Sequence, residues 1–341
     1  MTLLDQALLT EFWHLVAHRS ELAEEGAFLR LDWALGDLVV HNDEGDIIAF
    51  DNLCPHRGTR FFVEDHGVGR AVCPYHGWSY RGGQLRVPLA KTFAPGALDG
   101  VGIRRFQTAW CGDFLFVALS PAESLEAQLA GAFAPLAAVS TQIDGRRDFN
   151  AFEFQANWRV AVENALEGYH VNPIHPQTLA PLGLKDDATV YDGPNTTYIA
   201  QITDSRTLRG LKTMSRFFDV EGAYQGYWTI YVFPFAMLSS TFGYSYSLQT
   251  FLPSVTPERS HFCSRQLAGK VRPGYAAAVE GFLDSSARVN RQIFDEDHAI
   301  CARVSPRYDL TASDRIFAPG EERVARLHAI LTAMTPEQDP T

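Results

Sequence analysis

The sequence predicts a small all-β domain followed by a larger region in which helices and strands are mixed. Short alternating segments separated by turns run from about Phe28 to Leu119. Beyond them, the segment "GYWTIYVFPFAMLSSTFGYSYSLQTFLP" is rich in aromatic and β-branched residues, which favour antiparallel strands. Helical periodicity appears in "NWRVAVENALEGYH" and again in the long segment "GYAAAVEGFLDSSARVNRQIFDEDHAICARV".

The expected elements and the domain boundary can be assigned in order along the chain. Apolar residues spaced three and four apart predict a helix over residues 3–18. The sequence "NDEGD" at 42–46 is typical of a hairpin turn, and "GQLRVPL" and "FLFVAL" are expected strands. A helix start signal at Ser120 marks the expected boundary. We therefore expect one domain over residues 8–119, including the N-terminal helix, and a second over residues 120–341.

The composition is that of an ordinary globular protein, with 46% apolar and 20% charged residues in 341. The net charge of -11 disfavours a nucleic acid or an anionic membrane as partner, because both select basic surfaces. No apolar run approaches the roughly 20 residues of a membrane span, and the N-terminus lacks the features of a signal peptide. We expect a cytoplasmic protein. Of its five cysteines, Cys111, Cys263 and Cys301 are expected to be buried reduced thiols.

The other two cysteines lie in "CPHRG" and "CPYHGW", each followed closely by a histidine. These motifs contain Cys54 and His56, and Cys73 and His76. Two thiolates and two imidazoles could hold zinc. They could also hold a [2Fe–2S] cluster in which the cysteines bind one iron and the histidines the other. The adjacent glycines would let backbone amides approach the sulfurs.

Together the two motifs resemble the Rieske iron–sulfur motif of ring-hydroxylating and related oxygenases. The resemblance implies that Cys54, His56, Cys73 and His76 bind a [2Fe–2S] Rieske cluster. The first expected domain is then an electron carrier.

A second set of metal ligands is indicated further along the chain. His170 and His175 are followed much later by the acidic segment "IFDEDHAICA". Two histidines and a carboxylate form the facial triad that leaves positions open on Fe(II). Glu163, Glu167 and His170 are spaced to share one helix face, and Pro173 is expected to break that helix so that His175 returns. The alternatives are structural histidines and a solvated acidic face.

The pattern "NW…EN…E-x-x-H-x4-H" resembles the mononuclear iron motif of Rieske oxygenases, and the resemblance spans residues 8 to 305. It implies Asp297 as the third iron ligand, placed by the pattern "E-D-x-x-I". Glu167 matches a carboxylate that links the two metal centres across subunits. Many members have aspartate there, and glutamate occurs in some that act on quaternary ammonium compounds. Asn164 matches an asparagine near the iron, and Asn157 and Trp158 match a packing signature.

The resemblance further implies an α+β protein: an all-β Rieske domain beside a catalytic domain with an antiparallel sheet flanked by helices. It implies a homotrimer, a [2Fe–2S] cluster and a mononuclear Fe(II). The chain contains no flavin- or nicotinamide-binding motif, so electrons would come from a separate NAD(P)H-dependent reductase or a ferredoxin. The expected activity is that of a terminal oxygenase that uses O2 to hydroxylate or oxidatively demethylate a small organic substrate.

The substrate is the least determined part. We expect an aromatic compound, with a quaternary ammonium compound as the alternative. An aromatic-rich stretch could line an apolar pocket, form a cage for an ammonium group, or be ordinary sheet core; it contains Tyr227, Trp228, Tyr231, Phe233 and Phe235. A function of another class, a Rieske electron-transfer protein without oxygenase activity, would require the second ligand set to be incidental.

Overall fold

The computed structural model describes residues 1–33, 36–220 and 225–335. The chain begins with helix α1 (Leu3–Glu11), whose N-terminus is closed by a capping box between Thr2 and Asp5. The predicted helix over residues 3–18 is wrong in its second half, because His14–His18 form strand β1. The side chain of Gln128 accepts a hydrogen bond from the Trp13 backbone N–H (2.7 Å) and donates one to its carbonyl (2.8 Å). This long-range contact fixes the extended backbone.

The first half of the chain contains the expected β-rich region. Strands β2 (Ala27–Trp33), β3 (Gly36–Asp43), β4 (Asp46–Asp51) and β5 (His66–Val68) form a sheet in the order β4-β3-β2-β5. The turn at 42–46 is confirmed: Asp43 pairs with Asp46, and the two residues between them have positive φ, as a tight hairpin requires. The predicted strand also crosses residues 34–35, which lie outside the described residues.

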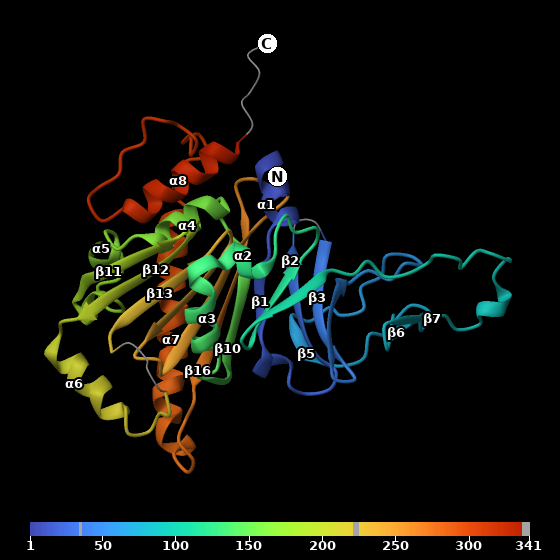
Figure 1. Cartoon of the computed structure of the whole chain (residues 1–341), viewed down its shortest axis with the longest axis horizontal. Coiled ribbons are helices and arrows are strands. Elements are labelled where there is room, and N and C mark those ends of the chain that lie inside the picture. Colours follow the sequence, from blue (N-terminus) through green and yellow to red (C-terminus); the bar gives the residue numbers. More distant parts are fainter. Residues whose placement is uncertain (34–35, 221–224, 336–341) are drawn as a thin grey trace.

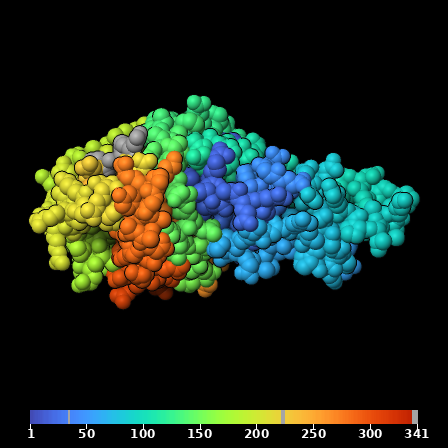
Figure 2. All heavy atoms as spheres, turned by 90° about the horizontal axis from the view of Figure 1, so that it is seen from below, coloured from blue at the N-terminus to red at the C-terminus, as the bar shows by residue number. Residues whose placement is uncertain are grey.

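A projecting arm follows this sheet. It carries the two-stranded ribbon of β6 (Ser79–Arg81) and β7 (Gln84–Arg86) and a 3-10 turn, η2 (Ala90–Thr92). Figures 1 and 2 show the arm as a narrow extension at one end of the molecule. Both predicted cluster-binding motifs precede the ribbon in the sequence, and their cysteines belong to a core cluster against which Leu85 and Phe93 of the arm pack.

A second small sheet joins the two halves of the chain. Its order is β1-β9-β8, with β8 at Gln107–Cys111 and β9 at Phe114–Ala118. The short 3-10 turn η1 (Arg19–Leu22) follows β1. Helix α2 (Leu125–Leu129) starts after Ser124 as N-cap and leads through η3 (Ala130–Ala132) into α3 (Phe133–Ser140). The domain boundary expected at Ser120 stays a prediction.

The second half is built on a seven-stranded antiparallel sheet of order β10-β16-β15-β14-β13-β12-β11. Its strands are β10 (Ile143–Phe154), β11 (Leu184–Asp192), β12 (Asn195–Ile202), β13 (Tyr227–Val232), β14 (Ala236–Thr241), β15 (Ser245–Pro253) and β16 (Ser260–Gly269). The helical elements are α4 (Trp158–Leu166), α5 (Val171–Ile174), η4 (Ala180–Leu182), α6 (Ser205–Met214), α7 (Ala276–Cys301) and α8 (Glu322–Met334).

The sheet has helices on both faces, as Figure 1 shows. On one face, Trp228, Ile230 and Leu248 pack with Leu129 and Leu136 of α2 and α3. The opposite face packs against α4, α7 and α8. This arrangement confirms the α+β class. Among the described residues, no helix combines the length and apolar character needed to cross a bilayer.

Candidate metal centres and their cavity

The two motifs near the arm fold into loops with the same hydrogen bonds. The Gly58 N–H donates to the Cys54 carbonyl (2.8 Å), and the Cys54 N–H donates to that of Thr59 (2.8 Å). In the second loop, Gly77 donates to Cys73 (3.0 Å), which donates to Trp78 (2.7 Å). Gly58 and Gly77 have φ of 69° and 71°, a left-handed conformation that glycine adopts without strain. The repeated motif therefore produces two matching turns.

The four predicted cluster ligands converge between these turns. The Cys54 thiol lies within hydrogen-bonding reach of Cys73, and both side chains are 2% exposed. The rings of His56 and His76 have centroids 4.7 Å apart, and His56 also stacks on Trp78 at 4.9 Å. His56 Nδ1 is buried without a hydrogen-bond partner in the described part of the chain. Paired thiols, paired imidazoles and an orphaned ring nitrogen fit the ligand set of a Rieske cluster.

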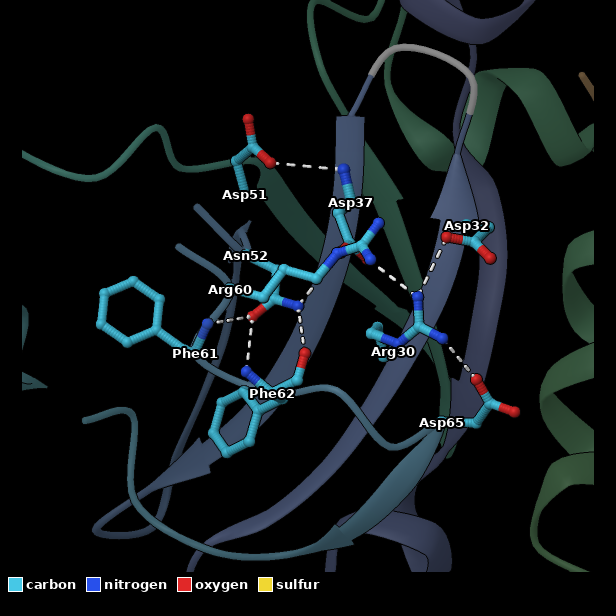
Figure 3. Close-up of polar contacts among 9 residues, drawn as sticks. All are labelled: Arg30, Asp32, Asp37, Asp51, Asn52, Arg60, Phe61, Phe62 and Asp65. Carbon is cyan, nitrogen blue, oxygen red and sulfur yellow. Dashed lines mark hydrogen bonds and ion pairs between the residues drawn. The ribbon is translucent and has the colours of Figure 1, made fainter. Parts of the chain in front are cut away.

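A polar network fixes the first loop to the β-sheet (Figure 3). Asn52, which is fully buried, accepts hydrogen bonds from the Phe61 and Phe62 backbone N–H groups at 3.1 and 2.9 Å. Its amide donates to the Phe62 carbonyl (2.6 Å) and to Asp37 (3.2 Å). Asp37 also accepts from Arg60 at 2.5 Å. The loop ends are thereby held on β3, which limits movement of Cys54.

The second predicted site lies where α4 ends. The helix stops at Leu166, and Glu167 is extended at φ -120° and ψ 165°. The expectation that Glu163, Glu167 and His170 share one helix face is therefore wrong. Pro173 does not break that helix either: it lies in the first turn of α5, where its missing N–H costs no hydrogen bond.

Glu163 is directed away from the metal ligands. It forms ion pairs with Arg159 at 2.9 Å and with Arg315 at 2.6 Å, so both of its carboxylate oxygens are engaged in structural contacts. Periodicity cannot show where a helix ends when the stop is set by tertiary contacts.

The structure brings His170, His175 and Asp297 together. One ligand atom from each lies within 4.8 Å of the others. Asp297 Oδ1 is 2.9 Å from His175 Nε2 and 3.5 Å from His170 Nε2. Two imidazoles and one carboxylate with an open side fit a mononuclear Fe(II) centre.

Each ligand is oriented by a further polar group. The Glu167 carboxylate contacts His170 Nδ1 and accepts from the His170 backbone N–H at 3.1 Å. Asn164, the other residue assigned here by sequence, donates to Asp297 Oδ1 at 2.8 Å. Glu296 was not predicted, yet its Oε2 lies 2.7 Å from His175 Nδ1 and accepts from Thr178 at 2.8 Å. The signal in the sequence is the acidic pair Glu296–Asp297, but the family pattern assigns a role only to its second member.

The charges of the site attract a cation. Burial alone would lower the pKa of His170, but the carboxylates of Asp297 and Glu167 outweigh it and raise the pKa to about 9. Burial would likewise raise the pKa of Asp297, but hydrogen bonds from both imidazoles lower it to about 2. The potential that favours a proton on the imidazoles equally favours a divalent metal ion.

A cavity of about 580 Å³ opens beside these ligands. His170, His175, Asp297, Asn164 and Glu167 all line it. The sheet contributes a polar floor, because its strands line the cavity with residues that carry hydroxyl and amide groups: Thr229, Ser239, Thr241, Ser245, Ser247, Gln249 and Gln266. A space of this size holds a small organic molecule beside the metal site.

The aromatic stretch contributes less to this cavity than its composition suggests. Of the five aromatic residues named above, Tyr227 lines the cavity. Tyr231, Phe233 and Phe235 pack in one core cluster and Trp228 in the other. The interpretation as ordinary sheet core is therefore correct for four of the five. Other aromatic lining residues come from separate elements, among them Tyr198 and Phe282.

The remaining sequence expectations concern structure. Cys111, Cys263 and Cys301 are buried free thiols, and burial raises their pKa to between about 11 and about 12. Asn157 caps α4 by accepting from the Arg159 N–H at 2.8 Å. Trp158 donates to Asp5 of α1 at 2.8 Å, which ties the first helix to the second half of the chain.

Comparison with known proteins agrees with this geometry. Residues 12–95 match the Rieske [2Fe-2S] domain. Among characterised proteins, the chain is 34% identical over 194 residues to the glycine betaine monooxygenase oxygenase subunit of Chromohalobacter salexigens, covering 54% of this chain and 42% of that protein. It is 28% identical over 190 residues to the 2-halobenzoate 1,2-dioxygenase large subunit of Burkholderia cepacia, covering 51% and 40%. The matches thus span less than half the length of these relatives.

Solved structures share the fold over nearly the whole chain. The quaternary ammonium Rieske monooxygenase CntA superposes with a TM-score of 0.76 at 18% identity, covering 96% of this chain and 90% of that one. Naphthalene 1,2-dioxygenase from Rhodococcus sp. gives 0.66 at 17% identity, covering 97% and 92%. Residues 140–337, more than half of the chain, match the ring hydroxylating alpha subunit (catalytic domain), so the chain belongs to the family of Rieske oxygenases.

Proposed function

We propose that this protein is a terminal oxygenase that uses O2 and externally supplied electrons to oxidise a small organic acid. Cys54, His56, Cys73 and His76 would bind the [2Fe–2S] cluster. His170, His175 and Asp297 would bind Fe(II), which when bound supplies O2 activation. The observation that carries the proposal is the convergence of these three ligands on one side of a substrate-sized cavity.

The protein's own residues have separate tasks around that centre. Glu167 and Glu296 hold the two imidazoles in place through their Nδ1 atoms, and Asn164 holds Asp297. The polar sheet floor would orient the substrate. Electrons would come from a separate NAD(P)H-dependent reductase or a ferredoxin, and the working protein would be a cytoplasmic homotrimer, as the family resemblance suggests.

For the substrate we propose a carboxylate that also carries a quaternary ammonium group. Two observations support it: the 34% identity to a glycine betaine monooxygenase subunit, and glutamate at position 167. The second candidate is an aromatic carboxylate, in line with the sequence-based expectation, and the relative named for 2-halobenzoate favours it. Both kinds of named compound carry a carboxylate. The hydroxyl-lined floor favours either over a bare hydrocarbon.

Product analysis tests this function directly. The purified protein, a surrogate reductase, NADH and isotopically labelled O2 would be incubated with glycine betaine or with benzoate and its 2-substituted forms. We expect a labelled product from one class, and none from the His170→Ala variant. Iron analysis should give about three atoms per chain, against about two for an electron carrier without oxygenase activity. Sustained oxidation with NADH and the isolated chain would overturn the requirement for a separate reductase.

A further inference from the structure

One cation in the cavity wall has no ion-pair partner among the described residues. Arg323, in the first turn of α8, lines the cavity and is only 7% exposed. Its Nη1 donates to the Thr229 hydroxyl at 3.2 Å, and its guanidinium lies 4.3 Å from the ring centroid of Tyr198. Within the described ranges, no carboxylate forms an ion pair with it.

The other deeply buried arginines show how unusual this is. Arg159, 5% exposed, pairs with Glu163 at 2.9 Å, and Arg265, fully buried, has Glu21 at 3.5 Å. A guanidinium cannot lose its proton inside a protein, so burial without a counterion carries a desolvation cost that hydroxyl and ring contacts offset only in part. Of these three, Arg323 alone borders the cavity, where an anion from outside could neutralise it.

Arg323 shares its cavity with the proposed iron site. The charges of Arg323 and Asp297 both act on the hydroxyl of Tyr227. All three residues line the same cavity. The N-terminal end of α8, with Pro319, Gly320 and Glu322, forms the adjoining wall.

Two carboxylates near this end of the cavity are otherwise engaged. Asp186 accepts a hydrogen bond from the Tyr198 hydroxyl. Glu322 accepts one from the Gly320 N–H at 3.2 Å, turned toward its own loop. Their charges act on Arg323, but neither carboxylate forms an ion pair with it, so the guanidinium keeps donors available for a ligand.

We propose that Arg323 binds the carboxylate of the substrate, which makes the cavity selective for small organic acids and directs their other end toward His170, His175 and Asp297. The inference rests on the proposed function and names the group that the site recognises. A planar guanidinium suits a carboxylate, because it can offer two parallel N–H donors.

Ligand binding to the holoprotein, kept oxidised and without reductant so that no turnover occurs, tests the assignment apart from catalysis. Two matched pairs serve as probes: glycine betaine against choline, and benzoate against benzamide. Each pair differs in its carboxylate. The variants are Arg323→Gln, Arg323→Lys and, as a control, Arg326→Gln. Arg326 lies one turn further along α8, exposed, donating to the Gly193 carbonyl at 2.8 Å.

We expect the wild-type protein to bind at least one acid about tenfold or more tightly than its partner without a carboxylate. Arg323→Gln should weaken binding of that acid by about 10- to 100-fold, the range of a lost charged hydrogen bond, and binding of the partner compound by less than about threefold. Arg323→Lys should retain part of the preference. Arg326→Gln should match the wild type, which excludes a long-range charge effect.

The alternatives give different results. If Arg323→Gln keeps the preference for the acid, Arg323 is a structural cation on Tyr198 and the inference is wrong, while product formation can still stand. If the wild-type protein binds no acid better than its partner without a carboxylate, the carboxylate assignment is wrong for this cavity. Should the glutamine variant fail to fold, the lysine variant still decides, because a lysine variant that prefers the acid as strongly as the wild type does would contradict the proposal.

Discussion

Glu296 gives the sharpest test of how the mononuclear site is held. Its carboxylate receives three hydrogen bonds: from His175 Nδ1 at 2.7 Å, Thr178 Oγ1 at 2.8 Å and Gln292 Nε2 at 2.9 Å. His175 is fully buried, so its ring orientation depends on such contacts. Replacing Glu296 by Gln keeps an acceptor for His175 and removes the charge, whereas Ala removes both.

The expected losses follow from these contacts. A charged hydrogen bond contributes about twice as much as a neutral one, so Glu296→Gln should lose about 1 kcal/mol of metal-binding free energy, or about fivefold in affinity. Glu296→Ala should lower the affinity for the metal by about 10- to 100-fold, the usual effect of removing a residue that hydrogen-bonds to a metal-binding histidine. The affinity for Fe(II) would be measured anaerobically by competition with a chromophoric chelator, with the visible absorption of the iron–sulfur cluster as a loading reference.

Asp295→Asn is the matched control, since Asp295 lies next to Glu296 on α7 and, within the part of the chain that the structure describes, forms no hydrogen bond to the site residues. It should bind iron as the wild type does. Unchanged affinity in Glu296→Ala would refute the orienting role. Equal losses in Glu296→Ala and Asp295→Asn would show that general negative charge matters and the hydrogen bond does not.

Three further predictions concern other parts of the chain. Burial lowers the pKa of His14 from 6.5 to about 4, so the folded state loses stability as the pH falls below 6.5 toward about 4. His14→Phe removes this titration, and its free energy of unfolding in urea should therefore fall by about 2 kcal/mol less than that of the wild type between about pH 7 and about pH 5. His170→Ala should lose the mononuclear iron and keep the Rieske visible and EPR signals, while His76→Ala should lose those signals. Gly112→Ala would bring Cβ into collision with Ser140 Oγ at φ +57°, so the midpoint of thermal unfolding should fall by several degrees. Gly145→Ala, with open space around it, should leave the midpoint unchanged.

Local patterns sufficed where chemistry is concentrated in a few adjacent residues. The two loops of the candidate cluster site each fit within one short motif, so the candidate ligands and the turn conformation could both be predicted from "CPHRG" and "CPYHGW". The hairpin at 42–46 and the long helix α7 that carries Asp297 are likewise local. Family resemblance then supplied the pairing of Asp297 with two histidines more than a hundred residues away.

Contacts between distant segments decided the rest. The side chain of Gln128 forms hydrogen bonds with the backbone of Trp13, and these stabilise an extended chain where the local pattern predicts the end of a helix. The last turn of α4 ends at Leu166, so a spacing that suits one helix face puts Glu163 and Glu167 in different environments. The unpaired state of Arg323 depends on which carboxylates fail to reach it, and no sequence pattern records that.

Glu167 combines the local and long-range aspects of the site. Its carboxylate contacts His170 Nδ1 and accepts from the backbone N–H groups of Tyr169 and His170, so the loop between α4 and α5 holds it in place. It also lines the cavity. A carboxylate in this position can stabilise positive charge on the imidazole as an electron moves. Its charge should therefore matter more for electron transfer than for metal retention.

Glu167→Gln separates these two effects, because glutamine keeps the length and one acceptor. We expect the variant to retain both metal centres, shown by iron content and EPR, and to transfer electrons between them far more slowly. Single-turnover mixing of the reduced protein with substrate and O2 would show this as slow recovery of the oxidised Rieske absorption. Glu167→Asp, which keeps the charge, is the control and should recover faster than the glutamine variant. Recovery at the wild-type rate in Glu167→Gln would mean that Glu167 only orients His170 and that the electron path runs elsewhere.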